Sequence, residues 1–509
     1  MEVKSNILDH LERTERRFGD KTAVEDEKSS LTYRELVTAA KRIGTGIARR
    51  VPPESPVPIL MEKSPLTLAA MLGAVYAGCF YVPVNPGNPP QRLERILGVL
   101  DPGIVVTERG TAGMPGETGY GEVAVDIEDL SGSDAEEALL AQIRESHKET
   151  DILYALFTSG STGTPKAVAV SHQSVIQFIG HFTEIFGVSQ ADRVGNQAPF
   201  DFDVSVKDIY SCIMTGAKLV LIPKAYFATP PRLMDYLCGK KVTTMIWAVS
   251  ALTLISSLKG LDYRVPEKVD KIMFSGEAMP PKQLRIWQEA LPKAEFVNLY
   301  GPTEVTCNCT YYRIGRKYGD GEKIPIGKAF PGRTVFLTDE DGTEIVTPGE
   351  TGEICSAGES LASGYYRSEE QTKERFVICP VKGGAGQRVY KTGDLGYYDE
   401  NGELVFAGRK DFQIKHMGHR IELEEVESAM NAVRGVTKSC CVFDHKRNRM
   451  SGFYIGEAEP SEVRWHMKEK VPVYMVPSRI RQVAAMPLNK NGKTDRSYFQ
   501  RLAEQSSPE

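Results

Sequence analysis

One loop of this sequence, residues 158–166, combines hydroxyl side chains, glycines and a lysine at a spacing suited to binding phosphate. It reads Thr-Ser-Gly-Ser-Thr-Gly-Thr-Pro-Lys, and apolar runs at residues 152–157 and 168–170 flank it. These runs predict two strands joined by the loop. Glycines let the backbone approach a ligand, while free N–H groups and hydroxyls form a concave anion site. Lys166 adds a point charge suited to phosphate.

Two other interpretations of the loop have to be weighed. A P-loop of the kinase or ATPase type needs Gly-Lys followed by Ser or Thr at the start of a helix. Here Pro165 precedes Lys166 and Ala167 follows it, and the chain continues as a strand, so the P-loop is excluded. An ordinary surface turn rich in Ser, Thr and Gly is the other alternative.

Two carboxylates, Asp201 and Asp203, lie among aromatic residues in the segment Pro-Phe-Asp-Phe-Asp-Val-Ser that begins at Pro199. A carboxylate buried alone costs free energy, so the pattern predicts a cation beside one of them. The alternative is that Asp203 or Ser205 only caps a helix that runs through residue 210.

Two further motifs have side chains that suit a nucleotide. Residues 296–304 read Phe-Val-Asn-Leu-Tyr-Gly-Pro-Thr-Glu. They predict a strand that ends in a turn, where Tyr300 offers a flat ring for a base and Glu304 a hard oxygen ligand for Mg²⁺. In Tyr-Lys-Thr-Gly-Asp, at residues 390–394, the carboxylate of Asp394 follows a glycine turn and can accept both hydroxyl protons of a ribose. The alternative for Glu304 is an exposed residue in a simple turn.

The composition restricts the class of protein. A chain of 509 residues is expected to form two or more domains. A net charge of −5 argues against a general nucleic-acid binder. No apolar run reaches the ~18 residues of a membrane span, and the start lacks a secretory signal, so a cytoplasmic protein is expected. The nine cysteines have no zinc-site spacing and are expected to be free thiols.

The elements that would position these motifs alternate along the chain. Residues 57–61 and 79–84 are predicted to be strands, with a helix at 66–75 between them. This alternation indicates βαβ units and a mainly parallel sheet. A helix is expected to begin near Thr32. A second helix has a core-facing stripe of Val426, Ala429, Met430 and Val433.

Taken together, the motifs resemble those of the adenylate-forming enzymes, which include acyl-CoA synthetases, luciferases and amino-acid adenylation domains of nonribosomal peptide synthesis. The matches run in family order from about residue 77 to 496 and cover most of the chain. The resemblance implies an α/β fold with a large N-terminal domain of mixed and parallel sheets flanked by helices, residues 1–410. It also implies a small mobile α+β domain, residues 411–509, with its hinge at Asp411.

The resemblance assigns roles to individual residues. It implies that Lys493, within Pro-Leu-Asn-Lys-Asn-Gly-Lys-Thr-Asp-Arg, is the catalytic lysine, that Glu304 holds Mg²⁺ and that Thr158 assists catalysis. ATP would be bound by Thr158, Ser159, Gly160, Ser161, Thr162, Gly163, Lys166, Gly276, Glu277, Ala278, Asn298, Tyr300, Gly301, Thr303, Asp394, Phe406 and Arg409. The amino-acid pocket would comprise Asp203, Val204, Lys207, Ile246, Met273, Ser275, Leu299, Cys307, Asn308 and Lys493.

Residues 202–205, Phe-Asp-Val-Ser, are similar to the Phe-Asp-x-Ser of members that adenylate amino acids, in which the Asp receives the α-ammonium. The resemblance therefore implies ATP-dependent formation of an aminoacyl-AMP, then transfer to the phosphopantetheine thiol of a carrier protein. A separate carrier is expected, because no attachment motif follows before Glu509. Within the family, D-alanine–carrier protein ligases are the most similar around Asp203 and residues 411–415. An acyl- or aryl-CoA ligase and a non-catalytic nucleotide-sensing or scaffold protein are the alternatives.

Lys207 replaces an apolar residue usual in this pocket, and its direction leaves two possibilities for the substrate. If the side chain points inward, an acidic substrate side chain is favoured, because a buried ammonium needs a counter-charge. If it points outward, a small residue such as alanine, serine or glycine fits.

Overall fold

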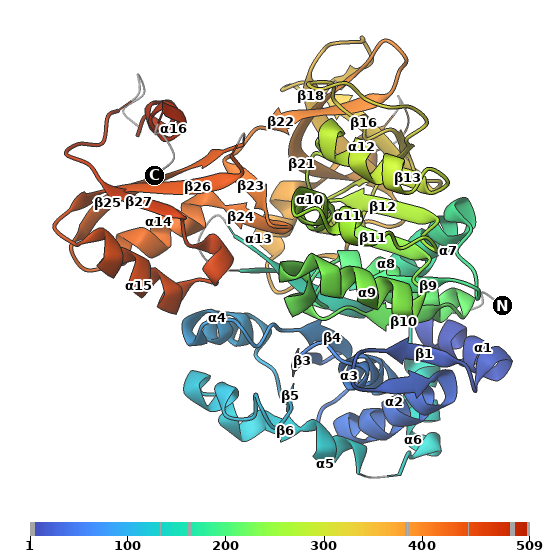
Figure 1. The fold of residues 1–509 in the computed structure, drawn as a ribbon. Coiled ribbons are helices and arrows are strands. Elements are labelled where there is room, and N and C mark those ends of the chain that lie inside the picture. The colour runs from blue at the N-terminus through green and yellow to red at the C-terminus, as the bar shows by residue number, and fades with distance from the viewer. Residues whose placement is uncertain are drawn as a thin grey trace.

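The structure is a computed structural model that describes residues 6–132, 134–160, 165–381, 384, 386–445, 447–488 and 494–505. Three larger sheets form the N-terminal part of the chain, and two small sheets form the C-terminal part, drawn in orange to red in Figure 1.

The first sheet has nine strands in the order β15-β14-β13-β12-β11-β9-β10-β1-β2. Its centre, from β13 to β1, is parallel, and antiparallel strands flank it at both edges. The strands are β1 (Thr22–Glu25), β2 (Ser30–Thr32), β9 (Arg193–Asn196), β10 (Lys218–Leu221), β11 (Thr244–Ala248), β12 (Lys271–Ser275), β13 (Glu295–Tyr300), β14 (Thr310–Arg313) and β15 (Lys328–Ala329).

The second sheet, in the order β19-β8-β7-β4-β3-β5-β6, carries the candidate phosphate loop between two of its strands. Strands β7 and β8 are antiparallel, and their register places Thr158 opposite Lys166. The strands are β3 (Pro56–Leu60), β4 (Phe80–Pro83), β5 (Val105–Thr107), β6 (Ala124–Asp126), β7 (Ile152–Thr158), β8 (Lys166–Ser171) and β19 (Gly364–Tyr365). Since β3 and β4 are parallel and joined by α3, the predicted βαβ unit is confirmed.

The third sheet is antiparallel, in the order β17-β16-β18-β21-β20, with β22 paired to β21. Its strands are β16 (Arg333–Thr338), β17 (Glu344–Ile345), β18 (Gly352–Gly358), β20 (Phe376–Pro380), β21 (Gly386–Tyr398) and β22 (Leu404–Arg409). The pairing of β21 with β22 places Asp394 directly opposite Arg409.

Helices cover the first two sheets, and one large apolar core joins both sheets to them. Helix α3 is buried on every side, whereas α2 is amphipathic and starts at a capping box of Thr32 and Glu35, as predicted. The helices here are α1 (Ile7–Phe18), α2 (Tyr33–Ala48), α3 (Pro65–Tyr76), α4 (Pro90–Leu100), α5 (Ile127–Ser131), α6 (Glu137–Ser146), α7 (His172–Phe186), α8 (Val204–Thr215), α9 (Pro230–Lys240), α10 (Val249–Ser257), α11 (Gly260–Tyr263), α12 (Pro281–Ala290) and α13 (Glu369–Arg375).

The C-terminal part has a core of its own, whose buried members all lie between Ile414 and Ile480. The predicted stripe of Val426, Ala429, Met430 and Val433 is buried in it. Its elements are β23 (Gln413–His416), β24 (His419–Glu422), α14 (Leu423–Asn431), β25 (Val436–Asp444), β26 (Arg449–Gly456), α15 (Pro460–Lys470), β27 (Arg479–Gln482) and α16 (Arg496–Gln505). A large domain followed by a smaller one is therefore confirmed, and the two meet where α15 contacts α4.

All nine cysteines are free thiols, as expected. Within the described ranges, no helix combines the length and apolar character that crossing a bilayer requires.

Candidate functional site

The predicted motifs surround one cavity, at the place where the C-terminal part meets the large domain. The large domain lines it with Thr158, Ser159, Asp203, Gly276, Gly301, Thr303, Asp394 and Arg409, among others. The C-terminal part lines it with Gln413, Lys415, Gly418, His419, Arg420 and Tyr474. Residues more than 250 positions apart thus share one site.

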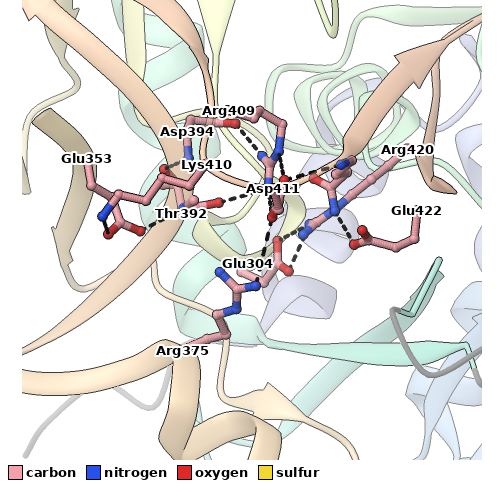
Figure 2. Close-up of polar contacts among 12 residues, drawn as sticks. Glu304, Glu353, Arg375, Thr392, Asp394, Arg409, Lys410, Asp411, Arg420 and Glu422 are labelled. Carbon is pink, nitrogen blue, oxygen red and sulfur yellow. Dashed lines mark hydrogen bonds and ion pairs between the residues drawn. The ribbon is translucent and has the colours of Figure 1, made fainter. Parts of the chain in front are cut away.

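Glu304 follows the cavity-lining Thr303 in the chain and is fully buried. Figure 2 shows its carboxylate facing Arg420, whose Nη1 lies 2.9 Å from both Oε1 and Oε2. The hydroxyl of Tyr365 donates a further hydrogen bond to Oε1 at 2.8 Å. Burial alone would raise the pKa of Glu304, but the Arg420 charge and this hydroxyl hold it below its usual value. The carboxylate is therefore ionised and bound by Arg420 in this domain arrangement.

The donor set at Glu304 fits the Mg²⁺ that the family implies. Mg²⁺ in nucleotide sites is usually held by one or two carboxylates together with phosphate oxygens, and Glu304 supplies an ionised carboxylate beside Arg420, which lines the cavity. Arg420 binds the same two oxygens in this domain arrangement. No cluster of three or more His, Cys, Asp or Glu side chains suited to a metal occurs in the described part of the chain.

Asp394, the candidate ribose ligand, belongs to a network with Arg409 and Asp411 (Figure 2). Its Oδ1 pairs with Arg409, and its Oδ2 accepts a hydrogen bond from the Tyr300 hydroxyl at 2.6 Å. Arg409 also donates to both carboxylate oxygens of Asp411, at 2.6 and 2.7 Å. Burial opposes a charge on Arg409, but Asp411 and Asp394 raise its pKa above the ordinary value. The predicted hinge residue is thus connected through Arg409 to the predicted ribose ligand.

The residues predicted to surround the base lie at the ends of β12 and β13. Gly276 has φ of +98°, and Glu277 accepts a hydrogen bond from the backbone N–H of Gly418 at 2.8 Å. A Cβ at Gly301 would lie 2.5 Å from Asn308 Cα, so only glycine fits this turn. Of the remaining residues, Asn298 donates to the carbonyl of Pro325, Phe406 lies near the Tyr300 ring, and Ala278 is exposed.

The candidate phosphate loop is described at its two ends. Thr158, Ser159 and Gly160 are buried, and the Ser159 hydroxyl donates to the carbonyl of Arg420 at 2.8 Å. The Nζ of Lys166 lies 5.4 Å from the centre of the Tyr365 ring. Burial, together with the charges of Arg375 and Arg420, lowers the pKa of Lys166. Ser161, Thr162, Gly163 and the predicted catalytic Lys493 lie outside the described residues.

Asp203 immediately precedes α8, but its side chain does not cap that helix. Its Oδ2 accepts a hydrogen bond from the Thr303 hydroxyl at 2.8 Å instead. Burial raises the pKa of Asp203, while the Lys207 charge and the Thr303 hydrogen bond oppose this rise. Neither Asp203 nor Asp201 forms a salt bridge with a described residue, since each meets hydrogen-bond donors and more distant charges, so the cation predicted beside them is not provided by the described part of the chain.

The predicted substrate pocket divides into a lining and a buried wall behind it. Val204, Ser275, Cys307 and Asn308 line the cavity together with Asp203. Lys207, Ile246, Met273 and Leu299 lie behind them, each at most 2% exposed. Lys207 points inward, and its Nζ donates to Asn308 Oδ1 at 2.6 Å. The sequence left two directions open for the Lys207 side chain, and in the structure this side chain points inward.

The C-terminal part contributes contacts that the sequence reasoning missed. Arg92 of α4 and Glu425 of α14 form a buried ion pair at 2.7 Å. His419 stacks on Tyr474, with ring centres 3.4 Å apart, and burial lowers its pKa to about 3. The only signal for these residues was the Gly-His-Arg segment beside the hinge, because pairs separated by hundreds of residues leave no local pattern.

Comparisons with known proteins agree with this geometry. The sequence profile of the family described as AMP-binding enzyme matches residues 11–366. Tyrocidine synthase 1 of Brevibacillus parabrevis is 31% identical over 490 residues, covering 94% of this chain and 43% of that protein. Surfactin synthase subunit 1 of Bacillus subtilis (strain 168) is 31% identical over 483 residues, covering 94% of this chain and 13% of its own. The chain thus spans less than half the length of these curated relatives.

Two solved structures show the same fold over almost the whole chain. IdnL1 has a TM-score of 0.78 at 27% identity, covering 95% of this chain and 99% of its own. Holo-PA1221, described as an NRPS protein containing adenylation and PCP domains, has a TM-score of 0.84 at 23% identity, covering 98% of this chain and 84% of its own. The profile match, the relatives and the fold agree with the motif order, and this chain belongs to the AMP-binding enzyme family of adenylate-forming ligases.

Proposed function

We propose that the chain activates an amino acid as its aminoacyl-AMP and transfers it to the phosphopantetheine thiol of a carrier protein. The environment of Asp203 is the observation that supports an amino acid as the substrate. Asp203 is a buried carboxylate that borders the cavity, accepts a hydrogen bond from Thr303 and forms no salt bridge with any described residue. An α-ammonium from the substrate would supply the missing positive charge.

In the first step, an oxygen of the substrate carboxylate attacks the α-phosphorus of ATP, and the bond to the β-phosphate breaks to release pyrophosphate. No general base is needed, because a carboxylate is ionised at neutral pH. Negative charge gathers on the phosphorus as the bonds change. In this proposal Lys166 and Lys493 offset that charge, and Thr158 and Ser159 bind phosphate oxygens.

Asp394 and Arg409 would hold the ribose, beside a base flanked by Tyr300 and the 276–278 turn. Glu304 would hold Mg²⁺, which when bound offsets phosphate charge. Since Arg420 binds both oxygens of Glu304 here, we assign the observed domain arrangement to the second step.

In the second step, the thiol sulfur attacks the acyl carbon, AMP leaves, and the thiol proton passes to solvent. Lys415 and His419 both line the cavity, which supports this assignment. Burial lowers the pKa of Lys415, and His419 is neutral at physiological pH. The PCP domain of PA1221, present with its adenylation domain in one protein, supports a carrier as the acceptor.

The test is ATP–pyrophosphate exchange with all amino acids of both hands, and with fatty and aryl acids as controls. Exchange with one or a few amino acids supports the proposal. Exchange confined to acids without an amino group would contradict the role of Asp203 and indicate a CoA ligase. A thioester assay with a phosphopantetheine-loaded carrier and with free CoA then distinguishes the two acceptors.

A further inference from the structure

Lys63, which is half-buried, and Lys207, which is fully buried, differ in how their ammonium groups are satisfied. Lys63 Nζ lies near four oxygens: Asn196 Oδ1 at 2.9 Å and the carbonyls of Asn196, Gln197 and Ala198 at 3.3 to 3.4 Å. Lys207 is 1% exposed and has a single hydrogen bond with a described residue, to the neutral side chain of Asn308. An ammonium carries three donors and prefers a counter-charge when buried. Lys207 is therefore incompletely satisfied by the described chain.

Asn308 connects this ammonium to the cavity. A lysine can only donate, so the amide of Asn308 must present its oxygen to Lys207 and direct its NH₂ group elsewhere. No described residue accepts a hydrogen bond from that NH₂ group, and Asn308 lines the cavity. Asn308 thus lines the cavity with an amide donor, and the ammonium of Lys207 lies directly behind it.

The charges around Lys207 indicate what kind of group would complete its interactions. Asp203 and Lys207 carry opposite charges and interact through space. An amino acid bound through its α-ammonium adds a second positive charge, while its α-carboxylate is used at the phosphorus. The neighbouring Asp208 does not compensate, since burial raises its pKa to about 8 and its Oδ2 accepts from Asn196. A second carboxylate on the substrate would restore neutrality.

We infer that the substrate is an amino acid whose side chain ends in a carboxylate, and that Lys207 and Asn308 recognise this carboxylate. The inference rests on the proposed amino-acid activation. It makes Lys207 the residue that selects acidic over neutral side chains, because the isosteric amide leaves an ammonium unpaired and a basic side chain is repelled.

The test compares acids with their isosteric amides in ATP–pyrophosphate exchange, using aspartate against asparagine and glutamate against glutamine, in both hands, with alanine, serine and lysine added. We expect kcat/KM for one acid to exceed that for its amide by about 100-fold or more. Lys207→Met should abolish this preference by lowering exchange with the acid about 100-fold.

Lys63→Met is the matched control, since it removes a half-buried ammonium that protein oxygens already satisfy. It should keep the preference for the acid even if it lowers the melting temperature. The comparison of acids with their amides is made on the unaltered chain. The inference can therefore be tested even if Lys207→Met does not fold. Binding of the acid, followed as the shift in melting temperature with a non-hydrolysable ATP analogue, gives a readout independent of turnover.

The possible failures are distinguishable. Equal or better exchange with neutral amino acids would overturn the role of Lys207 and leave amino-acid activation intact. A preserved acid preference in Lys207→Met would overturn it as well. Exchange only with acids lacking an amino group would contradict the proposed function itself.

Discussion

The buried ion pair between Arg92 and Glu425 offers a direct test of how the two domains divide the reaction. It joins α4 of the large domain to α14 of the C-terminal part at 2.7 Å, with side chains 7% and 2% exposed. Removing one member of a buried pair leaves an uncompensated charge and costs about 3–5 kcal/mol. The cost applies only while the domains are in this arrangement, because separation returns the remaining charge to water.

Glu425→Gln should therefore shift the domain equilibrium away from this arrangement. Since about 1.4 kcal/mol corresponds to tenfold, 3 kcal/mol predicts a fall of about 100-fold in the population of the arrangement. If the arrangement serves transfer, single-turnover thioester formation from preformed aminoacyl-AMP falls by about this factor. ATP–pyrophosphate exchange should stay within about twofold, because adenylation uses the other arrangement.

Two controls make the result specific. The double variant Arg92→Met/Glu425→Met removes both charges and should recover much of the lost transfer, since replacing a buried pair by apolar groups is often neutral. Asp20→Asn breaks the exposed pair with Arg34, whose side chains are 60% and 91% exposed, and should change neither step. Unchanged transfer in Glu425→Gln, or an equal loss in both steps, would refute the reasoning.

Three other predictions concern single residues. Lys493→Ala should abolish ATP–pyrophosphate exchange and spare transfer from preformed aminoacyl-AMP; unchanged exchange would remove it from the first step. Asp203→Ala should raise KM for the amino acid by at least about tenfold, with little change for ATP, since a charge-assisted hydrogen bond is worth about 1.5–3 kcal/mol; an unaltered KM would contradict α-ammonium binding. Burial raises the pKa of Asp208 from 3.8 to about 8. The protonated carboxyl group therefore contributes fully to folding stability below the pKa of the unfolded chain, and this contribution is lost as the pH rises through about 8. Asp208→Asn should accordingly gain melting temperature relative to the unaltered chain between pH 5 and 8.5, and a difference independent of pH would show that this carboxyl does not titrate in that range.

The sequence alone determined the fold class and most of the elements that carry the site. Apolar runs on either side of the 158–166 loop predicted β7 and β8, and the alternation around residues 57–84 predicted a βαβ unit. These features are local: periodicity, turn residues and caps depend on neighbours a few positions away. The order of the motifs also identified the family before any contact was known.

Only the tertiary structure decided which partners these residues meet. Lys207 follows Asp203 by one helical turn, but its burial depends on the sheet against which α8 packs, and its partner Asn308 lies 101 positions away. Glu304 meets Arg420 across 116 positions, and Arg92 meets Glu425 across 333. The first pair forms when distant elements of the large domain pack together, and the other two form where the two domains meet, so no local pattern in the chain records any of them. The kinds of chemical group in the site could therefore be predicted from the residue types, whereas the pairing of their charges depends on tertiary packing.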